Sequence, residues 1–200
     1  EYRTGCSCGR RSARTKRRAM LETAGPGAGR RPKTADERES TLNYLVRRFG
    51  DRVLKLAYYH VRDRYLAEDI CQEVFCRVYR HLDRFRGDSS YYTWIYRITM
   101  NLCRDYKASA YFRRMLPARM EEEVIAAAET RMFEIAEGGE VFSKVMDLPL
   151  KLRTVIALYY FEEMKTAEIA QVLGISEENV RKRLCRGREL LRKKLSQEER

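Results

Sequence analysis

Aromatic and basic side chains gather along residues 90–104, and this combination suits contacts with nucleic acid. The rings are those of Tyr91, Tyr92, Trp94 and Tyr96. On a helix that turns by about 100° per residue, Ile95, Ile98 and Leu102 share an apolar face. The side chains expected to point away from that face are Thr93, Arg97, Met100, Asn101 and Arg104. Unpaired bases stack on such rings while basic groups hold phosphates. The same residues also fit a solvated helix face beside core aromatics.

A second basic surface is predicted near the C-terminus. Thr166 is expected to cap a short helix, Gly174 and Ile175 to form a tight turn, and Ser176 to cap a longer helix. The apolar positions of these two helices are Ile169, Ala170, Leu173, Val180, Leu184 and Leu191. A short helix, a glycine turn, a cap and a longer basic helix are typical of a helix-turn-helix.

The longer helix offers groups that can contact DNA. The side chains off its apolar face, together with those of its first turn, are Ser176, Asn179, Arg181, Lys182, Cys185 and Arg186. Backbone amides at the start of such a helix can meet a phosphate, and the exposed side chains can enter the major groove. The alternative is an ordinary helical hairpin with a basic exterior.

Composition supports a polyanionic partner. The chain has 200 residues, with 41 Lys and Arg against 29 Asp and Glu, and a net charge of +12. Such a balance favours nucleic acid over an acidic protein surface or a neutral metabolite. The chain contains no apolar run of about 18 residues, so we expect no membrane insertion.

Nothing in the sequence suggests catalysis. It lacks a glycine-rich phosphate loop and any Ser/His/Asp or Cys/His arrangement, and its two histidines are His60 and His81. We therefore predict no catalytic residue and no cofactor. Cys6 and Cys8 have no second cysteine pair at zinc-ligand spacing, so no metal site is expected. The six scattered cysteines fit reduced thiols in a cytoplasm.

The hydrophobic periodicity predicts an all-α protein of two small helical domains joined by a flexible linker. In the first block, a stripe from Leu42 is interrupted at Gly50 and resumes to Val61. A helix follows over residues 65–82, and Ser90 caps a third. In the second block, Leu148 and Pro149 open the helix that precedes the helix-turn-helix.

Charge and composition predict four segments. Residues 1–40 form a basic arm rich in Gly, Pro and Arg, which we expect to be disordered. Residues 41–110 and 143–196 are the two folded blocks. Between them lies a net acidic linker over residues 111–142.

Residues 41–196 resemble a known protein family. AEDICQEVF at residues 67–75 is similar to the region 2 signature of bacterial extracytoplasmic-function sigma factors, in the sigma-70 family. FRGDSSYYTWIYRI at residues 85–98 is similar to their promoter-melting segment, and residues 166–194 resemble their region 4 helix-turn-helix. The resemblance makes residues 41–110 region 2 and residues 143–196 region 4.

The resemblance implies a function and a role for each motif. Such a protein binds the RNA polymerase core and directs promoter recognition, DNA melting and transcription initiation, and an anti-sigma factor usually partners it. Docking on a coiled coil of the largest polymerase subunit falls to Asp69, Gln72 and Glu73. Contact with the melted downstream promoter element falls to Asp88, Ser89, Tyr91, Tyr92, Trp94, Arg97, Asn101 and Arg104. Contact with the duplex upstream element falls to Ser176, Asn179, Arg181, Lys182, Cys185 and Arg186. Cys185 departs from the aromatic or polar side chain that often occupies its position.

Two further expectations come from the residues themselves. An autonomous helix-turn-helix regulator is the rival function, but it would need its own dimer interface and would leave the aromatic segment unused. Residues 1–19 match nothing in the family, and Met20 is the first methionine. We therefore expect the native chain to start at Met20.

Overall fold

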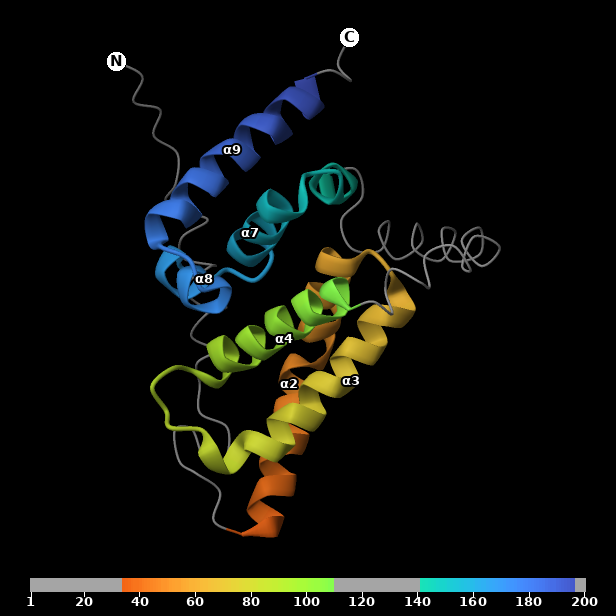
Figure 1. Cartoon of the computed structure of the whole chain (residues 1–200), viewed down its shortest axis with the longest axis vertical. Coiled ribbons are helices and arrows are strands. Elements are labelled where there is room, and N and C mark those ends of the chain that lie inside the picture. The colour runs from red at the N-terminus through yellow and green to blue at the C-terminus, as the bar shows by residue number, and fades with distance from the viewer. Residues whose placement is uncertain (1–33, 110–140, 197–200) are drawn as a thin grey trace.

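The computed structural model describes residues 34–109 and 141–196, and Figure 1 shows that both ranges are helical. The elements are α2 (Ala35–Val61), α3 (Arg64–His81), the 3-10 turn η1 (Leu82–Arg84), α4 (Tyr91–Ala108), α7 (Leu150–Tyr160), α8 (Thr166–Leu173) and α9 (Glu177–Ser196). The described residues contain no strand, which confirms the all-α prediction. No described helix is long and apolar enough to span a membrane.

Helices α2, α3 and α4 pack together in the N-terminal unit, residues 34–109 (Figure 1). The stripe of α2 is buried at Leu45, Phe49, Val53 and Leu56. Each of these side chains is at most 3% exposed, so α2 forms one wall of the core along most of its length.

Helix α2 differs from the sequence prediction in two ways. It runs unbroken through Gly50, because the apolar stripe on both sides packs on α3 and outweighs the modest helix penalty of glycine. It also begins at Ala35, inside the segment predicted to be a disordered arm. Thr34 caps this first turn: its hydroxyl accepts a hydrogen bond from the Glu37 amide at 3.2 Å, and the Glu37 carboxylate returns to the Thr34 amide at 3.4 Å. The remainder of the arm, and the predicted start at Met20, lie outside the described residues.

The other helix starts follow from short polar side chains. Asp63 accepts a hydrogen bond from the Leu66 amide at 2.9 Å and opens α3. Ser90 accepts one from the Thr93 amide at 3.2 Å and opens α4, as predicted.

The C-terminal unit, residues 141–196, contains the predicted short helix, turn and longer helix. Helix α7 begins at Leu150, so Pro149 is its N-cap and not, as predicted, part of its first turn. Gly174 ends α8 in the left-handed conformation with φ 66°, which glycine adopts without steric cost. The Asn179 amide donates to the Ser176 hydroxyl at 3.2 Å, so the Ser176 cap is confirmed.

The predicted cap at Thr166 is wrong. Lys165 is the N-cap of α8, and its amide donates to the Glu168 carboxylate at 2.7 Å. Thr166 is the first residue of the helix, and its hydroxyl donates to the Glu177 carboxylate at 2.6 Å. Because Glu177 begins α9, this bond joins the starts of the two helices of the helix-turn-helix.

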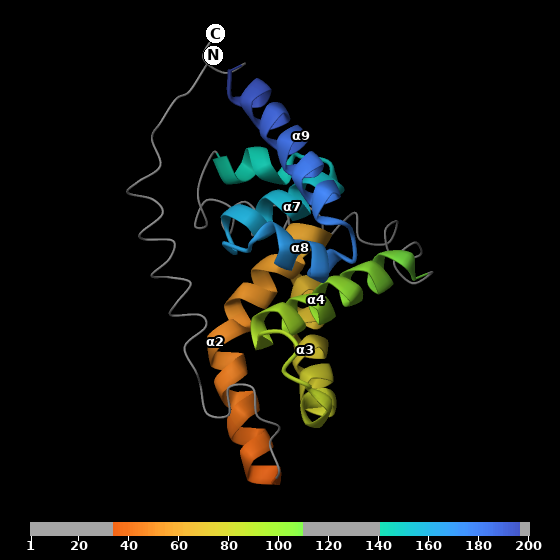
Figure 2. The ribbon, with the colours of Figure 1, turned by 90° about the vertical axis from the view of Figure 1, so that its left-hand side faces the viewer.

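The two units pack against each other. Helix α8 lies against α4, and α7 lies against α2; Figure 2 shows α8 beside the middle of the molecule with α9 beyond it. Buried side chains from both units form one continuous apolar core. This contact places part of α4 under the C-terminal unit.

Two helical glycines have opposite surroundings. A Cβ at Gly50 would meet no atom within 4 Å, whereas a Cβ at Gly187 would lie 2.9 Å from Cγ1 of Ile156. Gly187 is therefore where α9 approaches α7 closely.

We predict that Gly50→Ala and Gly187→Ala change stability in opposite directions. Gly50→Ala should raise the free energy of unfolding by about 0.5 to 1 kcal/mol, because alanine is the better helix former and space is open. Gly187→Ala should lower it, because Ile156 must move to make room. Urea denaturation followed by circular dichroism measures both. A Gly187→Ala variant more stable than the wild type would contradict the close packing of α7 and α9.

Candidate nucleic-acid interface

The predicted upstream-element side chains lie together at the start of α9. All of them are exposed: Ser176, Asn179, Arg181, Lys182, Cys185 and Arg186. The Ser176 hydroxyl accepts a hydrogen bond from the backbone amide of Asn179 at 3.2 Å.

Two of the basic side chains on α9 are already paired. Arg181 lies 2.6 Å from the Glu177 carboxylate, and Lys182 lies 2.7 Å from that of Glu178. The hydrogen bond from Thr166 and then that from Arg181 hold the pKa of Glu177 below its usual value. Within the two described ranges, Arg186 forms no ion pair, so it can meet a DNA group without exchanging a protein partner.

The predicted docking residues form a polar patch on α3. Asp69 and Gln72 are exposed, Glu73 is half-buried, and their spacing of three and four residues keeps them near one face. The Glu73 carboxylate accepts a hydrogen bond from Nε of Arg77 at 2.9 Å and lies 4.0 Å from Arg80. The patch therefore presents acidic and amide groups, of which Glu73 is held by neighbouring arginines.

Several predicted melted-strand residues form an aromatic cluster at the start of α4. The ring of Phe85 stacks on that of Tyr91 with centroids 4.3 Å apart, and the ring of Trp94 lies 5.0 Å from Phe85. Burial raises the pKa of Tyr91. Asp88 is exposed and Ser89 half-buried in the segment just before the helix.

Two other predicted melted-strand residues face the C-terminal unit instead. The Tyr92 hydroxyl donates to the backbone carbonyl of Glu162. Nε of Arg97 donates to the backbone carbonyl of Gln171 at 3.2 Å. The structure therefore separates the predicted set: Tyr91 and Trp94 belong to the aromatic cluster, while Tyr92 and Arg97 contact α8 and the loop before it.

One side of the far end of α4 is open to solvent. Asn101 and Arg104 are exposed, and Nε of Arg104 donates to the Met100 carbonyl at 3.2 Å. Thr93 and Met100 were also expected to point away from the apolar face, but they are only 3% and 1% exposed. That expectation fails because α4 packs on α2 and α3 with one side and on α8 with another.

Glu162 is the important residue that the sequence analysis missed. Its side chain is 4% exposed, and its carboxylate accepts a hydrogen bond from the Tyr96 hydroxyl and lies 3.5 Å from Arg52. Burial raises the pKa of Glu162, although the Tyr96 hydrogen bond and the Arg52 charge oppose the shift. No sequence signal marks it, because a glutamate beside Glu163 after an amphipathic helix resembles a solvated surface residue.

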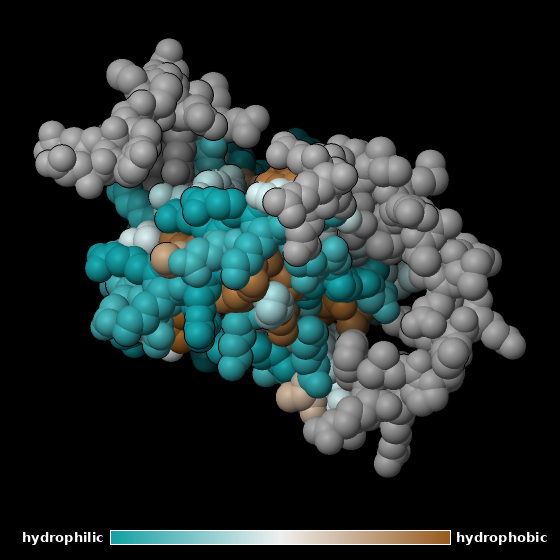
Figure 3. Space-filling view, turned by 90° about the horizontal axis from the view of Figure 1, so that it is seen from above, coloured by the Kyte–Doolittle hydropathy of each residue, from teal (hydrophilic) through white to brown (hydrophobic). Residues whose placement is uncertain are grey.

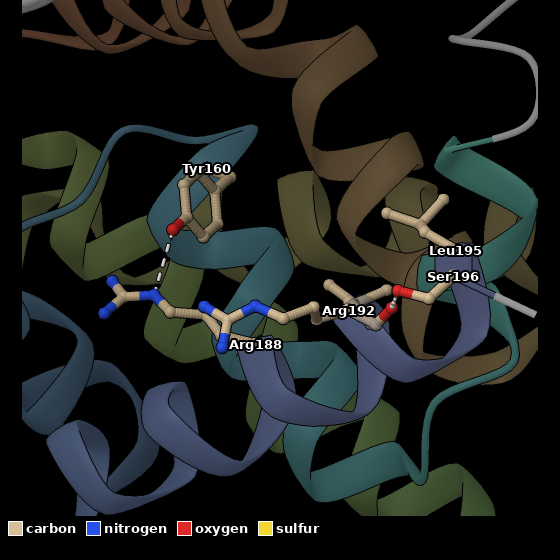
Figure 4. Close-up of a pocket in the computed structure, with 6 residues that line it drawn as sticks. Tyr160, Arg188, Arg192, Leu195 and Ser196 are labelled. Carbon is tan, nitrogen blue, oxygen red and sulfur yellow. Dashed lines mark hydrogen bonds between the residues drawn. The ribbon is translucent and has the colours of Figure 1, made fainter. Parts of the chain in front are cut away.

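The outer face of the C-terminal unit carries a groove between α7 and α9. Figure 3 views the molecule from this end and shows a mainly hydrophilic surface with hydrophobic patches. In the groove, Nε of Arg188 donates to the Tyr160 hydroxyl at 2.9 Å, and Arg192 and Leu195 line it (Figure 4). Leu191 also lines the groove. Among residues 34–109 and 141–196, no group of three His, Cys, Asp or Glu side chains could hold a metal ion.

The helix-turn-helix with its basic outer face, together with the aromatic helix α4, defines a helical nucleic-acid-binding protein. Comparison with known proteins makes this class specific. The family model for sigma-70 region 2 matches residues 45–113, and that for sigma-70 region 4 matches residues 143–191.

Curated relatives indicate the group of the family to which the chain belongs. It is 33% identical to the ECF RNA polymerase sigma factor SigW of Bacillus subtilis, over 76% of this chain and 87% of the relative. It is 31% identical to the RNA polymerase sigma-H factor of Pseudomonas aeruginosa, over 77% and 86% of the two chains. The chain belongs to the sigma-70 family, in its extracytoplasmic-function group.

Solved structures share the fold. CnrH in complex with the cytosolic domain of CnrY superimposes with a TM-score of 0.57 at 26% identity, covering 79% of this chain and 89% of that one. The sigma factor RpoE of Bartonella quintana, in complex with the anti-sigma factor NepR, gives 0.56 at 16% identity, covering 78% and 97%. The second likeness concerns the fold alone.

A buried histidine lies where the two units meet. His60 is 5% exposed, and Nη2 of Arg153 donates to its backbone carbonyl at 3.3 Å. Burial, followed by the charges of Lys107, Arg153 and Arg104, lowers the pKa of His60 to about 4.

We predict that His60 makes the protein less stable in mild acid. In the unfolded chain a histidine takes up a proton near its ordinary pKa of about 6.5, while the folded form resists until about pH 4, so the unfolded state binds more protons in between. His60 does not reduce the free energy of unfolding above about pH 6.5; the reduction begins as the pH falls below that value and reaches about 3 kcal/mol by pH 4.

The test is urea denaturation at several pH values in this window. His60→Gln should flatten the pH dependence relative to the wild type. His81→Gln changes the exposed histidine and should leave the dependence intact. Equal slopes for the wild type and His60→Gln would show that His60 is not held neutral.

Proposed function

We propose that this chain works in the cytoplasm as a sigma factor: it binds the RNA polymerase core and directs promoter recognition, DNA melting and transcription initiation. The observation that carries the proposal is the presence on one chain of two family-matched regions with different exposed surfaces. One surface is the acidic patch on α3, and the other is the basic face of α9. A regulatory rather than catalytic role follows from this family.

The docking role falls to Asp69, Gln72 and Glu73. Carboxylates and an amide on one helix face suit a basic helical partner, which can form charge-assisted hydrogen bonds with them. The ion pair between Arg77 and Glu73 is half-exposed. An arginine of the partner can therefore share the Glu73 carboxylate or replace Arg77. We assign this partner to the polymerase largest subunit.

The melted-strand role falls to the start and outer side of α4. A base flipped out of the duplex costs a few kcal/mol, which stacking and hydrogen bonds in a pocket can offset. The Tyr91 and Trp94 rings beside Phe85 supply a stacking surface, and Asp88 and Ser89 border it. Asn101 and Arg104 extend the surface along the helix, and Tyr92 and Arg97 complete the proposed set although both are hydrogen-bonded to the C-terminal unit.

The duplex role falls to α9. Arg186 can reach a base edge directly, whereas Arg181 and Lys182 must exchange Glu177 and Glu178 for DNA groups. Ser176 and Asn179 lie at the helix start, where a phosphate is favoured. Cys185 lies on the same face and adds a weakly polar contact.

Two parts of the proposal concern organisation and regulation. Residues 41–110 act as region 2, residues 143–196 as region 4, and residues 111–142 as the linker between them. Both solved structures hold the matching chain in complex with a second protein, and we propose that an anti-sigma factor binds this chain. An autonomous regulator would instead act without polymerase.

We predict that activity requires the polymerase. With purified bacterial core enzyme, the chain should give run-off transcripts from the DNA upstream of its own gene and permanganate-reactive thymines near the start site. Alone it should show weak, strongly salt-dependent DNA binding. Gln72→Ala with Glu73→Lys should abolish core binding in gel filtration, because the new ammonium repels a basic partner.

The matched control is Glu39→Lys, which makes the same charge change on an exposed residue of α2. Circular dichroism must show both variants folded. If the double variant still assembles with core polymerase, the docking face lies elsewhere. If the wild type binds its upstream duplex tightly and specifically without core enzyme, the chain is an autonomous regulator.

We predict that Arg186→Ala weakens binding to the upstream element by about 1 to 3 kcal/mol and relaxes the preference at one base position. Lys182→Ala should reduce affinity about equally for all sequences if the ammonium contacts a phosphate. Arg192→Ala changes an exposed arginine near the far end of α9 and serves as the control. Fluorescence anisotropy of the holoenzyme on a panel of single-base variants measures these effects. Unchanged affinity in Arg186→Ala would remove α9 from base recognition.

A further inference from the structure

Basic side chains gather around the end of α2. They come from α2 and its C-cap, from the last turns of α4 and from α7, and we call them the cationic cluster: His60, Arg62, Arg104, Lys107 and Arg153. Nη1 of Arg153 donates to the Met146 carbonyl at 2.7 Å, and Arg62 donates to the same oxygen. Nη2 of Arg153 donates to the His60 carbonyl at 3.3 Å. Two guanidinium groups therefore converge on one backbone carbonyl.

Within the part of the chain that the structure describes, one exposed carboxylate forms ion pairs with this cluster. Asp147 lies 3.2 Å from Arg62, and it is shared with Lys194 of α9, whose ammonium lies 3.9 Å away. Lys107 and Arg153 form no ion pair with any described residue. Positive charge in the cationic cluster therefore exceeds the negative charge that the described residues supply.

Two buried nitrogens of the cationic cluster have no hydrogen-bond partner among the described residues. They are Nε of Arg153 and Nδ1 of His60, and each of these residues is only 5% exposed. Buried polar atoms nearly always have a partner, because an unpaired one costs free energy. The buried side of the cluster thus has unmet charge and unmet hydrogen-bonding capacity, which a negatively charged ligand would balance.

The charges of the cluster also act on one another. Burial, followed by the charge of Arg62, lowers the pKa of Arg153 to about 10. Burial and then the charges of Arg153 and Arg62 lower the pKa of Lys107. The pKa of His60 is lowered by burial and by three of the same charges. Like charges that affect one another in this way favour a negative group placed among them.

The exposed side of the cluster suits a phosphate group. The side chain of Arg62 is 45% exposed, and Lys107 is half-buried, so both can meet a ligand from solvent. A guanidinium fork matches the oxygens of a phosphate, and an ammonium binds phosphate as a point charge. A phosphate also carries more negative charge and more acceptor oxygens than a carboxylate, which suits several cations at one place.

We propose that the cationic cluster is a phosphate-binding site, in which Arg62 and Lys107 contact the ligand and Arg153 attracts it from the buried side. A phosphate group can reach the site as a free phosphorylated compound, or as the backbone of a single DNA strand that passes the exposed Arg104. The proposal goes beyond the proposed function, because free phosphate would bind whether or not the chain docks on polymerase.

Nuclear magnetic resonance of the two histidines in the full chain tests whether phosphate binds. His60 belongs to the cationic cluster, and the exposed His81 is an internal reference. Sodium phosphate should raise the titration midpoint of His60, because a negative charge nearby favours the imidazolium form. Sodium chloride of equal ionic strength screens the cluster without filling the site, so it should raise the midpoint less. The midpoint of His81 should be the same in both salts.

Substitutions on the exposed side test which residues hold the ligand. Lys107→Gln and Arg62→Gln should each weaken the binding of inorganic phosphate about tenfold, measured by isothermal titration calorimetry, because each removes a charged hydrogen-bond donor. Lys151→Gln makes the same charge change on an exposed residue of α7 and should bind as the wild type does. Circular dichroism identifies a variant that fails to fold, and the other variant then decides.

A short single-stranded DNA oligonucleotide distinguishes the two sources of phosphate. If it raises the His60 midpoint and competes with inorganic phosphate, the site takes the DNA backbone. If inorganic phosphate alone raises the midpoint, the site takes a free phosphorylated compound. The proposal is overturned if neither ligand raises the midpoint above its value in chloride, or if the folded cluster variants bind phosphate as the wild type does. Binding that occurs only after Glu121, Glu122 and Glu123 are changed to Gln would also overturn it, because the chain's own carboxylates would then fill the site.

Discussion

Helix α4 packs on α2 and α3 with one face and on α8 with another, and the surface of the molecule depends on this double contact. An amphipathic helix usually presents one apolar stripe to a core and leaves the rest to water. Here a second partner buries Thr93, Tyr96 and Met100 as well. What remains for a ligand is the start of the helix and the strip that contains Asn101 and Arg104. The arrangement of the two units therefore determines which nucleic-acid contacts are available.

Much of the fold follows from signals that are local in the sequence. Ser90 and Ser176 cap the helices that their positions predict, and Pro149 precedes α7 as its fixed backbone geometry allows. Gly174 supplies the left-handed turn of the helix-turn-helix. These features were predictable because each involves residues within one helical turn of one another. The all-α class and the two family-matched regions follow from the same patterns.

The features that escaped prediction depend on contacts between distant residues. Gly50 looked like a break because helix propensity is local, whereas the packing of α2 on α3 decides the outcome. Thr166 looked like a cap, but its hydroxyl bonds to Glu177 in the next helix. Glu162 looked like a surface residue because its partners, Arg52 and Tyr96, lie 110 and 66 positions away in the sequence. A buried carboxylate can be recognised only once its partners are known.

Two glutamates in the first turn of α9 lower the positive charge of its basic face. Glu177 and Glu178 pair with Arg181 and Lys182 on a surface exposed to solvent, where such ion pairs add little stability. Their more important effect is on the local charge, which they lower next to the arginine and lysine that we propose meet DNA. A phosphate must displace a carboxylate at these positions, so nonspecific attraction to duplex DNA is weakened in this turn. Arg186 has no such competitor among the described residues, and its guanidinium is better placed to distinguish bases than to add general affinity. In the proposed duplex role, helix α9 would favour recognition of particular sequences over tight binding, which would suit a sigma factor brought to promoters by the polymerase.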